Sequence, residues 1–169
     1  MKPLSTVTED MDAQAVTPMP SPALRLATFL PYRLNVLATV ISEGLAQLYA
    51  ERFSLDIPSW RVLATVGEFK TITAKSIGQH AHMGKVKVSR AVTDLEARGW
   101  IERKQNPNDM REAFLALTLE GQRNYREIVP LAHGYDARLR TGLDDQEKEI
   151  LDVVIEKMLI NAKTREVEQ

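Results

Sequence analysis

One stretch decides the fold of this chain: Lys85-Val86-Lys87-Val88-Ser89-Arg90-Ala91-Val92-Thr93-Asp94-Leu95-Glu96-Ala97-Arg98-Gly99-Trp100-Ile101. Apolar residues recur along it at helical spacing, at Val88, Val92 and Leu95, which predicts an amphipathic helix. Gly99 favours the end of that helix, because glycine adopts the left-handed backbone conformation at little cost. The first turns carry long cationic and hydroxyl side chains, at Lys85, Lys87, Ser89 and Arg90. A short basic helix of this kind suits the major groove of DNA, although a solvated surface helix has the same pattern.

Residues on both sides of this stretch complete a helix-turn-helix followed by a β-hairpin. Upstream, residues 73–81 predict a short helix with Thr73 as its N-cap, and the next three residues, up to Gly84, form the turn between the two helices. Downstream, residues 100–105 and 112–119 predict two strands around a polar turn at 106–109. Two strands after such a helix form a β-wing, so we predict a mainly α fold with a small β-wing.

The predicted winged helix-turn-helix covers residues 56–120 and is flanked by further segments. Residues 1–28 are expected to be a flexible N-terminal arm, because the first 22 are rich in Pro, Thr and Ser. Apolar residues at helical spacing predict one helix within 29–55 and two within 121–169, the first of which we expect Pro130 to kink.

These flanking helices have apolar faces of their own, which a winged core does not need for cover. We therefore expect N- and C-terminal dimerisation helices in a two-fold homodimer, which would place two recognition helices about one helical turn of DNA apart. The alternative is that the flanking helices fold back onto their own core.

Composition restricts the class of protein. The 169-residue chain has no cysteine, which excludes disulfides, thiolate catalysis and thiolate metal sites. It has no apolar run long enough for a membrane span and no signal peptide, so we expect a cytoplasmic protein with no membrane partner. The net charge is only −1, but residues 61–111 hold 10 Lys and Arg against 5 Asp and Glu, whereas both flanks are acidic. This local excess of positive charge is typical of a nucleic-acid-binding surface.

From about Phe29 to Leu159 the chain resembles the MarR family of bacterial winged-helix regulators. The resemblance rests on an ordered set of residues: Pro58, Trp60, Val62, Leu63, Thr73, Ala74, Ile77, Val88, Ser89, Arg90, Leu95, Glu96, Gly99, Ile101, Arg103, Asn106, Pro107, Asp109, Arg111, Leu117, Thr118 and Gly121. One departure is Gly84, where many members have a capping side chain such as Asp.

The resemblance implies a homodimer that represses transcription from near-palindromic operators and releases DNA when a small molecule, often an aromatic acid, binds. It places the recognition helix in the major groove and the Arg111 side chain at the minor groove. The residues that we predict to contact double-stranded operator DNA are Thr73, Lys75, Lys85, Lys87, Val88, Ser89, Arg90, Arg103, Lys104, Asp109 and Arg111.

Residues 29–35, Phe-Leu-Pro-Tyr-Arg-Leu-Asn, resemble the first helix of a subgroup that controls degradation of aromatic acids and their coenzyme A thioesters. We therefore expect an effector pocket lined by Arg33, Asn35, Trp60 and Tyr125. Arg33 suits a carboxylate or phosphate, and the Trp60 ring suits an aromatic group. The alternatives are a solvated Arg33 and a Trp60 that only packs in the core.

An enzyme is the main competing class, and its best candidate residues are histidines. His80 and His82 are two positions apart, so they cannot lie on one helical face as metal ligands, and there is no glycine-rich phosphate loop. We predict no catalytic residue, no metal and no cofactor. A DNA-binding activator or architectural protein without a small-molecule ligand remains the alternative that the sequence does not separate from a ligand-responsive repressor.

Overall fold

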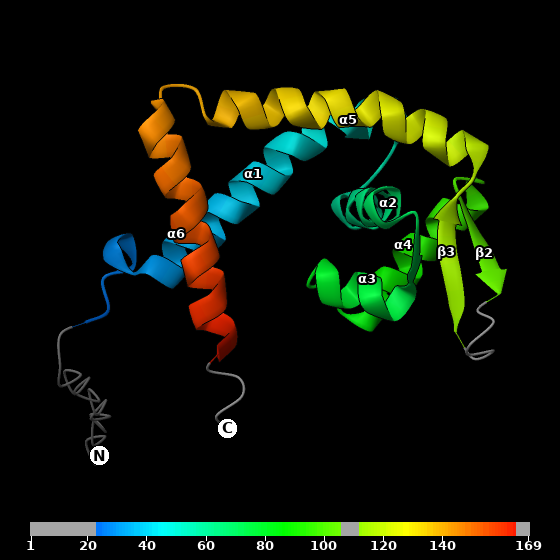
Figure 1. Cartoon of the computed structure of the whole chain (residues 1–169), viewed down its shortest axis with the longest axis horizontal. Helices are drawn as coiled ribbons and strands as arrows, with labels where there is room; N and C mark the ends of the chain where they lie inside the picture. Colours follow the sequence, from blue (N-terminus) through cyan, green and yellow to red (C-terminus); the bar gives the residue numbers. More distant parts are fainter. Residues whose placement is uncertain (1–22, 106–111, 165–169) are drawn as a thin grey trace, which may run out of the picture. The chain divides into compact units, whose positions relative to one another are not determined.

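The computed structural model describes residues 23–105 and 112–164, which are mainly helical with a small antiparallel sheet (Figure 1). The described helices are η1 (Leu26–Thr28), α1 (Leu30–Phe53), α2 (Ile57–Phe69), α3 (Ala74–His80), α4 (Lys85–Ala97), α5 (Leu119–Leu139) and α6 (Asp145–Thr164). The described strands are β1 (Thr71–Thr73), β2 (Ile101–Gln105) and β3 (Ala113–Leu117). This order confirms the prediction of a mainly α winged helix-turn-helix.

The chain divides into two compact units, residues 1–38 and 39–169. The described part of the first unit holds η1 and the beginning of α1, and every side chain in it is exposed. The short 3-10 helix η1 lies within the arm predicted for residues 1–28, so the last residues of that arm have regular structure. The predicted turn at 106–109, with Asp109 and the neighbouring Arg111, lies outside the described residues.

The hydrophobic core lies in the second unit and joins α2, α3, α4 and the sheet with residues of α1 and α5. Its fully buried members are Tyr49, Val62, Leu63, Val66, Ile77, Val88, Val92, Leu95, Leu115 and Ile128. The spacing of Val88, Val92 and Leu95 on α4 is the apolar face predicted from the sequence, and it packs against α2 and α3. Each such side chain contributes roughly 1.5–3 kcal/mol when it is removed from water.

Side-chain caps fix where most of these helices begin. The Thr73 hydroxyl accepts the backbone N–H of Ser76 at the start of α3, and the Thr118 hydroxyl accepts that of Gly121 at the start of α5. Before α6, the side chain of Asp144 accepts the N–H of Glu147 while the Glu147 carboxylate accepts the N–H of Asp144. The Thr73 cap confirms the predicted start of α3.

The sheet has one strand more than the predicted two-stranded wing. Its order is β1-β3-β2, all antiparallel, with Ile72 opposite Leu115 and Arg103 also opposite Leu115 on the other side. β1 has only three residues, of which one, Ile72, is buried, so its sequence has too little alternation to predict a strand. Pairing with β3, about 40 positions later in the chain, is what orders it.

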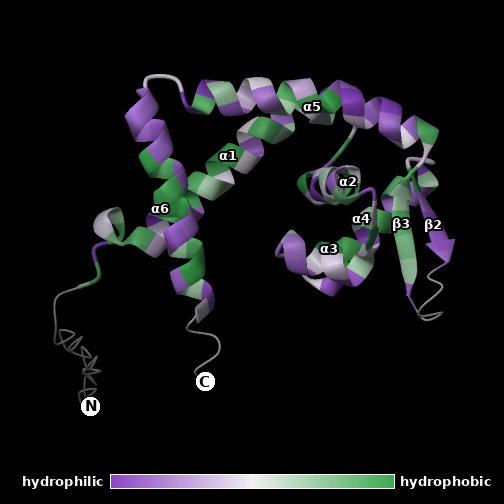
Figure 2. Cartoon of the chain, in the orientation of Figure 1, coloured by the Kyte–Doolittle hydropathy of each residue, from purple (hydrophilic) through white to green (hydrophobic). Residues whose placement is uncertain are grey.

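The two C-terminal helices differ in how they pack. α5 is continuous across Pro130 and buries Gly121 and Ile128, whereas no residue of α6 between Asp145 and Thr164 is buried. Arg140, after α5, pairs with Asp136 and with Asp152 of α6, and its hydrogen bonds to both raise its pKa. Figure 2 shows apolar residues along α6. Among the described residues, none of the helices has the length and hydropathy of a membrane span.

Candidate nucleic-acid interface

The first turns of α4 present a basic outward face. Lys85, Lys87, Ser89 and Arg90 are all exposed, as predicted from the sequence. These side chains lie opposite the buried stripe that holds α4 against the core, so their exposure follows from helical geometry. Exposed lysine, arginine and hydroxyl side chains on the N-terminal half of a helix are the groups that contact phosphates and base edges.

Two valines of this helix have opposite environments. Val88, predicted as a DNA contact, is 2% exposed and belongs to the core, so the structure corrects that assignment. Its side chain lies on the same helical face as Val92 and Leu95, and that face must be buried for α4 to pack. Val86 is 64% exposed on the outward face, and the prediction from sequence omitted it. An apolar side chain there suits the methyl group of thymine. The sequence did contain a signal for its exposure, because two residues two positions apart in a helix point to opposite faces.

A hollow lies between the helix-turn-helix and the wing, beside the first turns of α4. It has a volume of about 550 Å³ and is lined by residues of α3, α4 and the sheet, with Glu112 at its edge. Five of the predicted DNA contacts line it: Lys75, Lys85, Ser89, Arg103 and the buried Val88. The fold therefore gathers side chains from three elements into one positively charged surface.

The turn between α3 and α4 has a strained backbone. His82 has a φ of +49°, and Met83 closes the turn by donating its N–H to the carbonyl of Gly78. Gly84 is the N-cap of α4 without a side-chain acceptor, as expected for glycine at this position. Thr73, by contrast, uses its hydroxyl as the N-cap of α3 and is only half exposed.

Basic residues of the wing strand β2 are held by carboxylates. The Arg103 guanidinium makes two hydrogen bonds to Glu96 of α4, from Nε to Oε1 at 2.7 Å and from Nη2 to Oε2 at 3.0 Å. Lys104 lies 3.2 Å from the Glu102 carboxylate. Arg103 therefore fastens the wing to the recognition helix, in addition to its predicted role at DNA.

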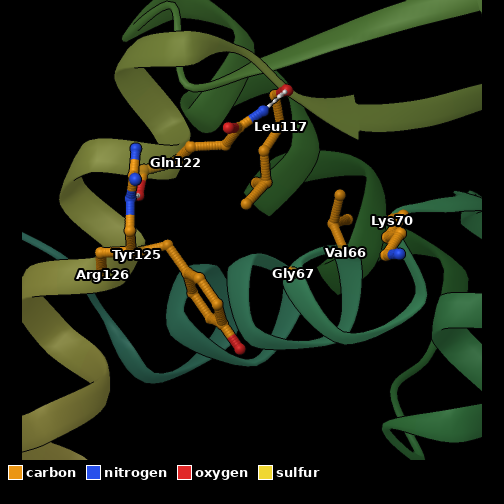
Figure 3. A pocket seen from close by; sticks show the side chains of 7 residues that line it. All are labelled: Val66, Gly67, Lys70, Leu117, Gln122, Tyr125 and Arg126. Atoms are coloured by element: carbon orange, nitrogen blue, oxygen red, sulfur yellow. Dashed lines mark hydrogen bonds between the residues drawn. The ribbon is translucent and has the colours of Figure 1, made fainter.

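Of the residues predicted to line an effector pocket, Trp60 and Tyr125 belong to the second unit, and Arg33 and Asn35 belong to the first. Trp60 packs against the core, with its ring 5.5 Å from that of Tyr49, so the packing alternative describes its contacts. Tyr125 extends from α5 toward α2 beside Gly67, where a Cβ would lie 2.5–2.8 Å from the tyrosine ring (Figure 3). Arg33 and Asn35 are exposed on the part of α1 that belongs to the first unit.

A hollow of about 440 Å³ lies beside Tyr125, between α2, β3 and α5 (Figure 3). Lys70 and Arg126 contribute positive charge to its lining, and Val66 and Leu117 contribute apolar surface. Lys70 ends α2 with a φ of +62°, a conformation that side chains rarely adopt. The lining of this hollow thus combines an aromatic ring, apolar side chains and two cations.

Polar side chains of the described residues lack the arrangement that a metal site requires. No cluster of three or more His, Asp or Glu side chains suited to a metal occurs among them. His80 lies 3.7 Å from the Glu68 carboxylate and packs edge-on against Phe69, so it links α3 to the end of α2. Burial raises the pKa of the Tyr49 phenol from 10.0 to about 12, with a further contribution from Asp56.

Comparison with known proteins identifies the same segment. Residues 55–113 match the model of the MarR family. YwoH, an HTH-type transcriptional regulator of Bacillus subtilis strain 168, is 29% identical over 120 residues, which cover 71% of this chain and 86% of YwoH. The transcriptional repressor MprA of Escherichia coli K12 is 36% identical over 75 residues, which cover 44% of this chain and 43% of MprA.

Among solved structures, that of an E. coli MarR variant complexed with operator DNA has the same fold. It superposes with a TM-score of 0.67 at 23% identity and covers 77% of this chain and 94% of the MarR chain. Residues 55–113 are thus similar in sequence to the MarR family, and the fold of the described residues is similar to that of the MarR structure.

Proposed function

We propose that this protein is a homodimeric transcriptional repressor that binds a near-palindromic operator and acts in the cytoplasm, where that DNA lies. The observation that carries the proposal is the exposed basic face of α4, with Lys85, Lys87, Ser89 and Arg90 next to Lys75 of α3. The net charge of −1 does not oppose this function, because the positive excess is confined to residues 61–111. The names of the compared proteins are those of regulators, which favours regulation over catalysis.

Exposed apolar side chains support the dimer. Large ones lie along the beginning of α1, including Leu30, Leu34 and Leu37, and along α6, including Val154 and Ile155. Apolar faces of this extent are rarely left in water by a folded protein and are typical of subunit interfaces. A two-fold dimer would present two copies of α4 to successive major grooves.

DNA selected from a random pool by the protein tests the proposal. We expect a near-palindromic consensus and binding whose log K falls with log salt at a slope of about −5, as for about six neutralised phosphates. Arg90→Ala should weaken binding to the selected DNA by about 1–3 kcal/mol and blur its sequence preference. Arg123→Ala is the matched control, since Arg123 is exposed on α5 and pairs with Glu120. Failure to enrich any sequence would refute the function.

We further propose that an aromatic acid or its coenzyme A thioester releases the operator. The predicted effector residues are Arg33, Asn35, Trp60 and Tyr125. The aromatic, apolar and cationic lining of the hollow beside Tyr125 supports the proposal of a ligand with a ring and an acidic group. A ligand there touches α2 and α5, so it can shift the separation of the two recognition helices. Coupling of about 1–3 kcal/mol corresponds to roughly a 5- to 150-fold loss of operator affinity.

The alternative is a DNA-binding regulator that takes no small molecule. Titrating aromatic acids with and without operator DNA separates the two, because linkage requires operator DNA to weaken effector binding by the same factor. Equal affinities in both titrations would show that a compound is no effector. If no compound raises the melting temperature either, the protein regulates without such a ligand.

A further inference from the structure

The guanidinium of Arg98, just after the last turn of α4, bridges two helices. Its Nε donates to the Asp94 carboxylate at 2.7 Å, within the same helix end. Its Nη1 donates to the carbonyl of Phe53 at 3.1 Å, and its Nη2 donates to the carbonyl of Ser54 at 2.8 Å. The side chain is 29% exposed, so these bonds are partly shielded from water.

The two carbonyls belong to the end of α1. Phe53 is the last residue of that helix, and Ser54 follows it with a φ of +49°. Carbonyls in the last turn of a helix have no partner within the helix and lie at the negative end of its dipole. Arg98 supplies that partner from 44 and 45 positions further along the chain, and it is a cation, which the dipole favours.

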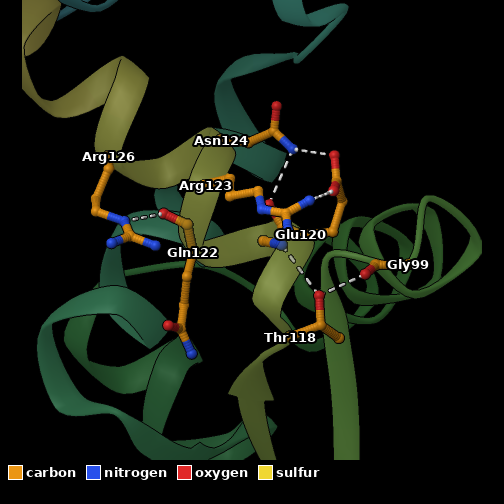
Figure 4. A network of polar contacts seen from close by, with 8 residues as sticks. Gly99, Thr118, Glu120, Gln122, Arg123, Asn124 and Arg126 are labelled. Atoms are coloured by element: carbon orange, nitrogen blue, oxygen red, sulfur yellow. Dashed lines mark hydrogen bonds and ion pairs between the residues drawn. The ribbon is translucent and has the colours of Figure 1, made fainter.

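The residues that follow Arg98 are also joined to the beginning of α5 (Figure 4). The Thr118 hydroxyl donates to the carbonyl of Gly99 at 2.6 Å, and the Thr118 N–H donates to the carbonyl of Trp100 at 3.0 Å. Residues 98–100 thus connect the end of the recognition helix to the end of α1 and to the beginning of α5.

Phe53 is buried in the core, but side-chain packing leaves a gap beside Arg98. A hollow of about 440 Å³ lies between α4 and the turn that leads from α1 into α2, lined by Asp56, Pro58, Lys87 and Arg90 among others. Arg98 lies at the edge of this hollow and spans from one side to the other. A guanidinium with hydrogen-bond acceptors on both sides fixes the relative orientation of two helices better than one flexible contact does.

We propose that Arg98 is a positioning residue that makes the direction of the recognition helix follow α1. The inference rests on the proposed function, in which α1 contributes to the dimer. Arg98 would then set the relative placement of the two recognition helices without contacting DNA. Its loss should affect DNA that engages both lobes and spare DNA that engages one lobe.

The test compares wild type with Arg98→Met, which keeps the apolar stem and loses every donor, on DNA selected by the wild type. Affinities are measured on the two-half-site DNA, on variants with the spacing changed by one or two base pairs, and on DNA with a single half-site. We expect about a tenfold loss on the selected spacing, a broader spacing optimum, and single-half-site affinity within about twofold of wild type.

Two further variants keep the experiment decisive. Arg98→Lys retains the charge but not the forked donor group, so its affinity for the two-half-site DNA should lie between those of wild type and Arg98→Met. It also takes the place of Arg98→Met in the experiment if that variant does not fold. Arg123→Met removes an exposed arginine of α5 and should change none of the affinities. Equal losses on one and two half-sites, or an unchanged spacing profile, would overturn the role of Arg98. If the wild type itself selects no sequence, the proposed function fails instead.

Discussion

At the scale of single residues, exposure decides the role of two valines that are only two positions apart. Val86 faces outward and Val88 faces the core, although both lie on the basic half of α4. The same residue type therefore stabilises the core in one case and is available for contact with DNA in the other.

Alanine at each of these positions should separate the two roles. Val88→Ala should lower the free energy of unfolding by about 2 kcal/mol, because it leaves a cavity in the core. Val86→Ala should leave stability within about 0.7 kcal/mol, since alanine favours a helix, but weaken the preference for thymine at one operator position. Urea unfolding measures the first effect and selection from random DNA the second. Equal destabilisation by both variants would contradict the opposite burial.

Tyr49 should make the stability depend on pH in the alkaline range. Its pKa is raised by burial to about 12 from 10.0, so the folded chain keeps the phenol protonated where the unfolded chain loses the proton. The stability that this group contributes is complete below pH 10 and is lost as pH rises toward 12. Two pKa units correspond to about 3 kcal/mol as an upper estimate.

The measurement is urea unfolding of wild type and Tyr49→Phe from pH 8 upward. The variant should lose less stability above about pH 10 than the wild type, because phenylalanine does not ionise. Tyr32→Phe, which removes an exposed hydroxyl on α1, is the control and should follow the wild type. Parallel pH profiles for all three proteins would show that the Tyr49 phenol is not responsible.

At the scale of elements, close contacts between backbones hold the helices to the sheet. Gly121, in the first turn of α5, lies against the Trp100 backbone just before β2, and a Cβ there would collide with the Trp100 carbonyl oxygen. Arg52 of α1 pairs with Glu127 of α5, and Arg103 of β2 pairs with Glu96 of α4. Exposed ion pairs of this kind contribute little, so the tight backbone contact is the stronger constraint.

Two glycines of α5 give a matched test of that constraint. Gly121→Ala should destabilise the fold by about 1–3 kcal/mol or more, because the carbonyl oxygen of Trp100 cannot yield as a side chain can. Gly134→Ala should stabilise it by up to about 1 kcal/mol, because nothing lies within 4 Å of a Cβ there and alanine favours a helix. Thermal melts of both variants measure the difference. The same sign of change in both would contradict the described packing.

At the scale of the whole molecule, the unburied helix α6 is the feature that the fold of one chain leaves unexplained. Val154 and Ile155 are exposed together with apolar residues before and after them. A helix with an apolar face and no buried residue gains little from its own chain, so the proposed dimer accounts for it best.

A lysine on each face of α6 tests this account. Val154→Lys should shift the protein from dimer to monomer in sedimentation, because a charge would have to be buried in the interface. Affinity for two-half-site DNA should fall by more than about tenfold, since one lobe alone would bind. Glu156→Lys, on an exposed charged position of the same helix, should keep the dimer. A wild-type protein that sediments as a monomer would refute the prediction.

Helices α1 to α6 and strands β2 and β3 were predictable from the sequence, because their signals are local. The caps at Thr73, Thr118 and Asp144 and the periodicity of α4 each involve residues within a few positions of one another. The exposed basic face of α4 follows from the same periodicity, so most of the candidate site was predictable in this way.

Contacts between residues far apart in the chain could not be predicted from the sequence and follow only from the folded structure. β1 exists because Ile72 pairs opposite Leu115, and Arg98 has its role because α1 ends beside it. Arg103 is held by a carboxylate of α4 across seven positions and an intervening glycine turn. No local pattern specifies such partners, because the entropy of closing the intervening loops is offset only by the assembled core.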